Sequence, residues 1–211
     1  MSPGAIIRRM FGPYERQISE AYRRMFIDLD RFTALIQAWR PAPQRILEVG
    51  CGEGAMTERL SRAYPEAEIV AIDITPRLGR LYRGSPARVR FIECTVQEIA
   101  AAQPGAFDLV LLSDVLHHVP IPQRQGLLDA VRQTLAANGG FIFKDWERTT
   151  SLIHWACYAS DRWLTGDKVS YMTRPEMLER LHQVFAESAI IAEKRCAPHV
   201  NNLAFLVQAR L

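Results

Sequence analysis

Three glycines, each separated by one residue, directly follow a short apolar run. Residues 46–54 read Ile-Leu-Glu-Val-Gly-Cys-Gly-Glu-Gly, and helical periodicity begins immediately afterwards, at Met56. Glycine allows backbone amides to approach a ligand closely, and the first turn of a helix offers N–H groups that have no partner within the helix. A strand, a glycine-rich turn and a helix start in this order predict a nucleotide-cofactor site.

Two classes of cofactor fit this segment. Because Glu48 stands two residues before the first glycine, the run resembles motif I of class I S-adenosylmethionine (SAM)-dependent methyltransferases. Gly50, Gly52 and Ala55 also satisfy the G-x-G-x-x-A pattern of dinucleotide-binding folds, and Asp73 follows about 20 residues later, as expected for NAD. Three features favour SAM. The first expected strand contains an acid, and roughly forty residues of largely helical pattern precede it. The rest of the sequence is too short for a separate substrate domain. An NAD(P)-binding oxidoreductase and a catalytically inactive SAM-binding partner subunit are the alternatives.

Composition indicates an ordinary globular chain. The 211 residues are 48% hydrophobic and 23% charged, which predicts one domain with a sizeable core. No apolar run approaches the roughly 18 residues of a membrane span, and the first residues lack the apolar core of a signal peptide, so we expect a cytoplasmic protein. The four cysteines have no C-x-x-C spacing, which predicts neither a zinc site nor a disulfide framework. The net charge of +3 is too small to indicate a nucleic-acid partner.

Apolar runs and helical patterns alternate after residue 40. The expected strands are 45–49, 68–72, 88–92, 107–112, 140–144, 188–194 and 203–209, and the expected helices are 55–64, 76–82, 97–102, 123–136 and 177–185. Continuous apolar strands suit a parallel sheet that is covered on both faces. The resemblance implies a doubly wound, Rossmann-like α/β fold with seven strands in the order 3-2-1-4-5-7-6, the last strand being antiparallel.

The first forty residues are expected to form a helical extension. Apolar residues recur at spacings of four and three from Ile18 to Trp39, which is typical of one apolar helix face. We therefore divide the chain into an N-terminal helical lid, 1–40, and a methyltransferase domain, 41–211. Packing on the domain is the simplest role of such a face, and contact with a membrane surface is a minor alternative.

The resemblance implies a role for each residue near the expected strand ends. The glycines would let the backbone close over the homocysteine part of SAM, Glu48 would face the cofactor's amino group, and Asp73 would accept hydrogen bonds from both ribose hydroxyls. Thr95 or the amide of Val96 would contact adenine, and Ser113 would lie near the methionine end. The expected cofactor contacts are Glu48, Gly50, Cys51, Gly52, Gly54, Asp73, Ile74, Thr95, Val96 and Ser113.

Polar residues that follow the fourth and fifth strands are the candidates for catalysis. Residues 107–120 resemble motif IV of small-molecule methyltransferases and lack the Asn/Asp-Pro-Pro-Tyr sequence of enzymes that methylate nucleobase amines. A hydroxyl acceptor benefits from a base that titrates near neutrality, and the candidates are His117, His118, Lys144 and Asp145. Ubiquinone-pathway O-methyltransferases look similar here but carry metal ligands at the positions of Asp114, His117 and His118. We expect no metal, and a divalent ion is the alternative.

Aromatic residues on both sides of the motifs are expected to surround the methyl acceptor. Three of the four tryptophans fall between Trp146 and Trp163, a stretch of aromatic character that suits a planar or apolar ligand. The expected acceptor contacts are Tyr14, Tyr22, His154, Trp155, Tyr158 and Trp163. Ordinary core packing of these side chains is the alternative. The sequence thus predicts methylation of a small apolar or aromatic metabolite, with oxygen favoured as the acceptor atom because bases are available.

Overall fold

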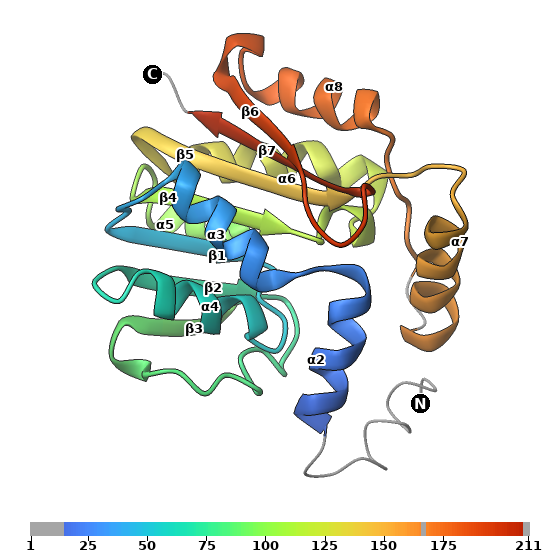
Figure 1. Cartoon of the computed structure of the whole chain (residues 1–211). Helices are drawn as coiled ribbons and strands as arrows, with labels where there is room; N and C mark the ends of the chain where they lie inside the picture. Colours follow the sequence, from blue (N-terminus) through green and yellow to red (C-terminus); the bar gives the residue numbers. More distant parts are fainter. Residues whose placement is uncertain (1–14, 166–167, 209–211) are drawn as a thin grey trace.

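A computed structural model describes residues 15–165 and 168–208, and its centre is a single seven-stranded sheet (Figure 1). The strands lie in the order β3-β2-β1-β4-β5-β7-β6. Neighbouring strands from β3 to β5 pair in parallel, whereas β7 is antiparallel to both β5 and β6. The strands are β1 (Arg45–Val49), β2 (Glu68–Asp73), β3 (Val89–Glu93), β4 (Phe107–Ser113), β5 (Leu135–Trp146), β6 (Ile190–Arg195) and β7 (Asn202–Gln208). This arrangement confirms the predicted fold class.

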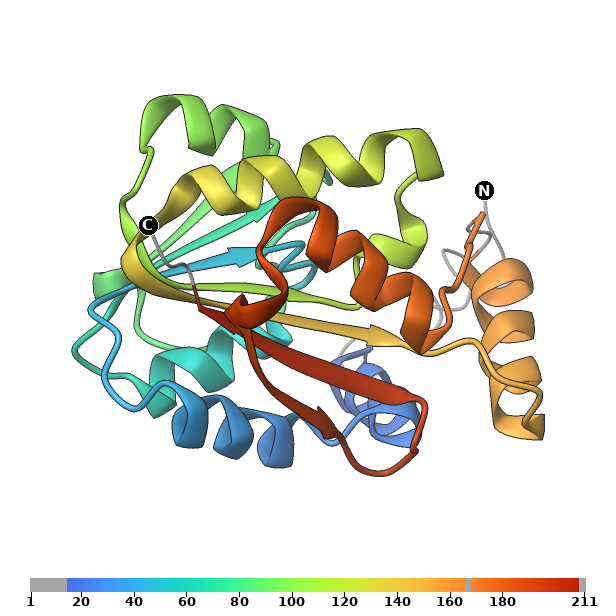
Figure 2. The ribbon, with the colours of Figure 1, turned by 90° about the horizontal axis from the view of Figure 1, so that it is seen from above.

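Helices cover both faces of the sheet (Figure 2). The α-helices are α2 (Glu15–Phe26), α3 (Leu29–Trp39), α4 (Ala55–Ala63), α5 (Val96–Ala102), α6 (Ile121–Thr134), α7 (Leu152–Ala159) and α8 (Arg174–Val184). Shorter helices are η2 (Pro86–Arg88), η3 (Leu116–His118), η5 (Glu187–Ala189) and the π-helix η4 (Ser160–Thr165). The core on one face contains residues of α5, α6 and α8, and the core on the other contains residues of α3 and α4. Among the described helices, none is both long enough and apolar enough to cross a bilayer.

The predicted helix at 76–82 is wrong. The segment is a series of turns, and Gly79 has a φ of +65°, a left-handed conformation that cannot continue a helix. Two of its amides bond to the glycine-rich loop: the Gly79 N–H donates to the Gly52 carbonyl at 2.8 Å, and the Leu81 N–H donates to the Glu53 carbonyl at 3.0 Å. The segment therefore supports the loop that follows β1.

The apolar face predicted between Ile18 and Trp39 is divided between two helices. Asp28 interrupts it, because its carboxylate accepts hydrogen bonds from the amides of Asp30 and Arg31 and so caps the start of α3. Helix α3 packs into the core, where Phe32 and Ile36 are buried. The two parts of the extension thus have different surroundings.

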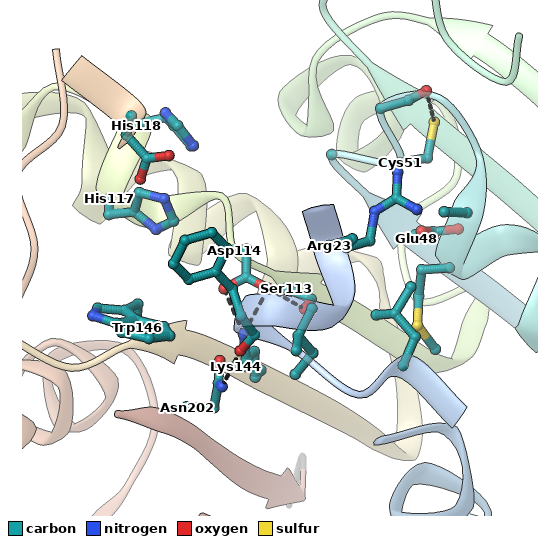
Figure 3. A pocket seen from close by; sticks show the side chains of 18 of the residues that line it. Arg23, Glu48, Cys51, Ser113, Asp114, His117, His118, Lys144, Trp146 and Asn202 are labelled. Carbon is teal, nitrogen blue, oxygen red and sulfur yellow. Dashed lines mark hydrogen bonds and ion pairs between the residues drawn. The ribbon is translucent and has the colours of Figure 1, made fainter. Parts of the chain in front are cut away.

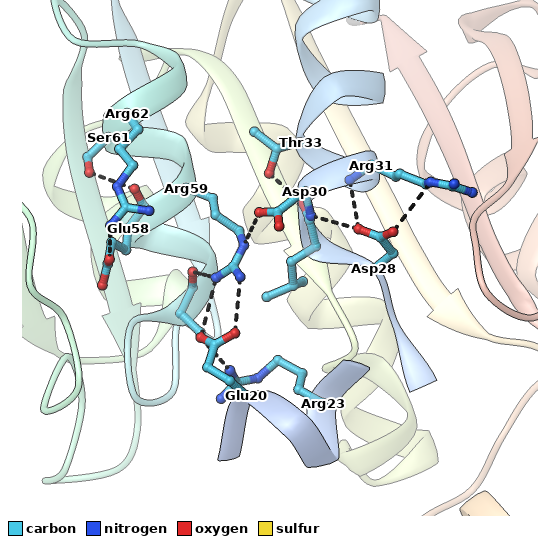
Figure 4. A network of polar contacts seen from close by, with 12 residues as sticks. Glu20, Arg23, Asp28, Asp30, Arg31, Thr33, Glu58, Arg59, Ser61 and Arg62 are labelled. Atoms are coloured by element: carbon cyan, nitrogen blue, oxygen red, sulfur yellow. Dashed lines mark hydrogen bonds and ion pairs between the residues drawn. The ribbon is translucent and has the colours of Figure 1, made fainter. Parts of the chain in front are cut away.

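Charged side chains connect α2 to α4, the helix that follows the glycine-rich loop (Figure 4). Arg59 of α4 pairs with Glu20 of α2 at 3.1 Å and with Asp30 of α3 at 2.7 Å. Arg16 of α2 pairs with Glu58 of α4 at 2.9 Å. These ion pairs fix α2 beside the carboxyl ends of the strands.

The conformation at Gly79 gives a test with a definite sign. Gly79→Ala should lower the free energy of unfolding by roughly 1–3 kcal/mol, since a Cβ would be strained at this φ and would lie 2.6 Å from the Phe91 ring. If Gly79 lay inside a helix, the same change would instead raise the free energy of unfolding by up to about 1 kcal/mol. Gly126→Ala is the matched control: this glycine lies inside α6 with no atom within 4 Å of an added Cβ, so the variant should be stabilised. Urea unfolding measures the free energy of unfolding of both variants. A stabilised Gly79→Ala protein would contradict the left-handed turn conformation at Gly79.

Candidate functional site

Two adjoining cavities lie at the carboxyl ends of β1, β2, β4 and β5. The first has a volume of about 330 Å³ and contains the glycine-rich loop together with the ends of β4 and β5. The second, of about 630 Å³, contains Asp73, Ile74 and Thr95 beyond β2 and β3. Both are lined by Gly50, Asp114 and His118 among others, so they form one continuous depression. Ligands of doubly wound sheets bind at this edge.

The glycines of the loop are required by its backbone. Gly50, Gly52 and Gly54 all have positive φ values. A Cβ on Gly50 would lie 2.2 Å from the Val115 side chain, whereas a Cβ on Gly52 would meet no atom within 4 Å and would project into open space. Asp73 orders this turn, because its Oδ2 accepts a hydrogen bond from the Gly52 N–H at 2.8 Å. The open side of Gly52 is where a ligand can contact the backbone.

Glu48 is a buried acid with unsatisfied hydrogen-bonding capacity. Its side chain lines the first cavity, is 4% exposed, and its Oε2 atom has no hydrogen-bond partner among the described residues. Burial raises the pKa of this carboxyl to about 7, and the nearby charge of Asp73 acts in the same direction. A buried acceptor without a partner fits a cationic donor on a bound ligand.

The remaining predicted cofactor residues have mixed surroundings. Ile74 is 77% exposed and lines the second cavity. Thr95 also lines it, but its hydroxyl forms a capping box with Glu98 at the start of α5. Val96 is buried and lines neither cavity. Cys51 lines the first cavity, and burial raises the pKa of its thiol, which makes it an unreactive structural cysteine.

His117 and Asp145 form a buried pair, and His117 lines the first cavity (Figure 3). His117 Nδ1 contacts Asp145 Oδ1, and the His117 backbone N–H donates to Asp145 Oδ2 at 3.1 Å. Burial alone would lower the pKa of His117, but the Asp145 carboxylate outweighs it and holds this pKa above its usual value. Conversely, His117 holds the pKa of Asp145 below its usual value despite the burial of that carboxyl. His118 is exposed, and its ring lies 4.1 Å from that of His117.

Lys144 and Asp114 form a second pair in the same cavity. The Lys144 ammonium lies 2.6 and 2.7 Å from the two Asp114 oxygens, and Ser113 donates a hydrogen bond to one of them. Asp114 has a φ of +57°, which is uncommon for a residue other than glycine. The structure brings Asp114, His117 and Asp145 within reach of one another, whereas the alternative metal set predicted from the resemblance has His118 in place of Asp145.

Aromatic side chains form one wall of the first cavity. The Phe26 and Trp146 rings lie edge to face at 6.0 Å, and Tyr171 stacks on His117 at 4.7 Å. Tyr171 also donates a hydrogen bond to Asp161. Sequence periodicity did not select Phe26 or Arg23, which line this cavity from α2, because no motif marks either residue.

The predicted acceptor residues lie beside or behind this wall. His154 accepts a hydrogen bond from Trp146 Nε1 at 3.2 Å, so it supports the wall from behind. Trp155 is 61% exposed, and neither it nor Tyr158 lines either cavity. Tyr14 lies outside the described residues, as do the side chains of Tyr22 and Trp163.

Comparisons with known proteins agree with this geometry. Residues 46–139 match the sequence model of a family described as a methyltransferase domain. The ubiquinone biosynthesis O-methyltransferase of Xanthomonas campestris pv. campestris is 30% identical over 151 aligned residues, which cover 58% of this chain and 62% of that protein. The corresponding protein of Xanthomonas oryzae pv. oryzae shows the same identity and coverage. The chain therefore spans less than two thirds of the length of these relatives.

Solved structures share the fold at low identity. The 1,6-didemethyltoxoflavin-N1-methyltransferase of Burkholderia thailandensis, with bound 1,6-didemethyltoxoflavin and S-adenosylhomocysteine, is 19% identical with a TM-score of 0.68, covering 98% of this chain and 88% of that one. The N-methyltransferase NodS of Bradyrhizobium japonicum is 17% identical with a TM-score of 0.61, covering 95% and 98%. Residues 46–139 therefore match a methyltransferase domain, and the chain shares the fold of solved methyltransferases, one of which holds S-adenosylhomocysteine.

Proposed function

We propose that this protein methylates a small, apolar or aromatic metabolite, with oxygen as the favoured acceptor atom. The observation that carries the proposal is the His117–Asp145 pair, because His117 lines the same cavity as the glycine-rich loop and the buried Asp145 contacts its ring. The ubiquinone biosynthesis O-methyltransferases and the toxoflavin-type N-methyltransferase support a small-molecule acceptor, but they differ in the acceptor atom. The preference for oxygen therefore depends on this chain's own residues.

The residues of the first cavity fit the methionine end of SAM. Glu48 offers its buried oxygen to the amino group, and Arg23, which lines the same cavity from α2, offers a cation to the carboxylate. Asp73 lines the second cavity and is suited to the ribose hydroxyls, with Ile74 and Thr95 beside the adenine. Bound SAM supplies a methyl group that is already activated on a sulfonium, so the protein's main tasks are alignment and proton removal.

His117 is the proposed general base. With Nδ1 donating to Asp145, Nε2 is left to accept the proton of an acceptor hydroxyl. The imidazolium that forms is stabilised by the buried Asp145 carboxylate, which also fixes the ring. Phe26, Trp146 and Tyr171 provide apolar surface for a planar acceptor and reduce the access of water.

The division into residues 1–40 and 41–211 remains a prediction. Within the extension, α3 packs into the core, whereas α2 contributes Arg23 and Phe26 to the cavity. We infer that α2 serves as the lid over the acceptor, held by its ion pairs with α4.

The first test concerns SAM binding. Asp73→Ala should weaken SAM binding by roughly 1.5–3 kcal/mol, since it removes a charged acceptor from the ribose and from the Gly52 amide. Asp108→Ala is the matched control: this carboxylate also accepts two backbone N–H groups, those of Gln44 and Arg45, but at the opposite end of β1. The control should lose stability and keep its affinity. Isothermal titration measures the SAM affinity of both variants, and equal affinities would contradict the assignment of Asp73.

The second test uses the raised pKa of Glu48. Folding favours its neutral form, so its contribution to stability is complete below the ordinary value of 4.5 and is lost as pH rises through about 7. Between about pH 5 and about pH 8, the wild type should therefore lose up to about 3 kcal/mol more stability than Glu48→Gln. Urea unfolding at both values measures this difference. Added SAM should stabilise the wild type more at the higher pH, because its amino group favours the carboxylate, and an equal effect at both values would separate Glu48 from the cofactor.

The third test separates the two histidines. The acceptor is first identified by incubating the protein with isotopically labelled SAM and a metabolite extract, followed by mass spectrometry. His117→Ala should then lower turnover by about 10²–10⁴-fold with SAM affinity little changed, whereas His118→Ala should stay within about tenfold of the wild type. His117 must be neutral to accept a proton, and its pKa is raised, so activity should increase with pH at a value above the usual imidazole pKa. Asp145→Asn should move this increase to lower pH, because it removes the carboxylate that raises the pKa. Full activity of His117→Ala would leave alignment alone as the mechanism, and absence of turnover in the wild type would favour an inactive partner subunit.

A further inference from the structure

Lys144 places a buried positive charge at the reactive end of the first cavity. Its side chain is 1% exposed, and the two oxygens of Asp114 are its hydrogen-bond acceptors among the described residues. An ammonium group carries three N–H donors. Because Lys144 also lines the cavity, part of its donor capacity remains for a group bound there.

The backbone holds the partner carboxylate in place. The φ of +57° at Asp114 is a costly conformation that persists only where the surroundings enforce it. Here the Asp114 N–H donates to the Lys144 carbonyl at 2.9 Å, and Ser113 donates to the carboxylate. The ion pair is thus fixed at both of its ends, and Figure 3 shows it at the centre of the site.

The same pair lies within a group of residues whose chemistry suits a divalent cation. Asp114, His117 and Asp145 each offer a ligand atom, and these atoms all lie within 4.8 Å of one another. However, Lys144 engages both Asp114 oxygens, and His117 engages both Asp145 oxygens through its ring and its backbone N–H. The positive charge of Lys144 opposes a second cation at this place.

We propose that Lys144 is a built-in substitute for a divalent metal, and that its ammonium binds and stabilises the ionised oxygen of the methyl acceptor. This role rests on the proposed function. The acceptor O–H bond breaks and its proton passes to His117 Nε2, while Lys144 donates a hydrogen bond to the oxygen. An oxygen lone pair then forms the bond to the methyl carbon, and the electron pair of the broken C–S bond stays on sulfur, which becomes neutral.

The arrangement also selects among acceptors. An acidic hydroxyl, such as that of a phenol, gains from an ammonium donor because its oxygen becomes negative as it reacts. A protonated amine presents a positive charge and gains nothing from the same donor. Lys144 therefore favours phenol-type acceptors over amines.

Metal binding tests the proposal without any acceptor or cofactor. Mn²⁺ alone is titrated into the full chain and followed by electron paramagnetic resonance. The wild type should leave millimolar Mn²⁺ free. Lys144→Ala should bind it, because Asp114 is released from its ion pair and can act as a ligand together with His117 and Asp145. The double variant Lys144→Ala, Asp114→Asn should lose this binding. Tight Mn²⁺ binding by the wild type, or none by a folded Lys144→Ala protein, overturns the proposal.

A chromophoric phenol tests the second half. 4-Nitrophenol is added to the wild type with S-adenosylhomocysteine, and the visible absorbance of its phenolate is recorded against pH. Binding should lower its apparent pKa by about one unit, a factor of ten in ionised fraction at low pH. Lys144→Gln should abolish the shift, and Lys144→Arg should retain part of it. An unshifted wild-type titration overturns the proposal even if the variants do not fold. Failure of the wild type to bind S-adenosylhomocysteine would instead count against the proposed function, which the Mn²⁺ measurement does not require.

Discussion

The parallel pairing of β4 with β5 is the constraint on which the reactive site depends. In its register Leu112 lies opposite Phe143 and Ser113 lies opposite Lys144, so the end of β4 lies beside Lys144 of β5. Asp114 and Asp145 then follow at the same edge, next to the glycine-rich loop that begins where β1 ends. Because side chains alternate along a strand, a slip of one residue would turn Lys144 away from Asp114. The pairings with His117 and Lys144 thus follow from strand register, which the apolar residues on both strands enforce.

Electrostatics divides the buried charges of this site into two kinds. Asp145 and Lys144 are each paired with an oppositely charged or protonatable partner, so the cost of burying them is offset within the protein. Glu48 is different, because its Oε2 atom has no hydrogen-bond partner among the described residues, and burial together with the nearby charge of Asp73 raises its pKa. A fold retains such a group when a ligand completes it, and the amino group of SAM has the required charge. We therefore assign the paired charges to the proposed chemistry and Glu48 to the proposed cofactor site.

Sequence patterns predicted the sheet well because its strands are continuous apolar runs bounded by turns. They failed at 76–82, where Thr75 and Pro76 are typical of a helix start but Gly79 adopts a left-handed conformation to support the neighbouring loop. Proximity of His117 to Asp145 could be expected, since both follow neighbouring strands. The roles of Arg23, Phe26 and Tyr171 could not, because they depend on how α2 and the segment after η4 fold back over the strand ends. Helical spacing alone also gives no means to tell that Trp155 faces solvent while Trp146 is buried.

The acceptor atom is the property that the fold leaves open. Structures that share the fold of this chain include enzymes that are named N-methyltransferases, whereas its curated relatives are named O-methyltransferases. In the proposed function, cofactor binding depends on backbone geometry near β1 and β2, whereas the acceptor meets side chains at the carboxyl ends of β4 and β5. In this chain they provide a histidine held by a buried carboxylate and an ammonium held by a partly exposed one, and we propose that this combination removes a proton and stabilises the oxygen left behind.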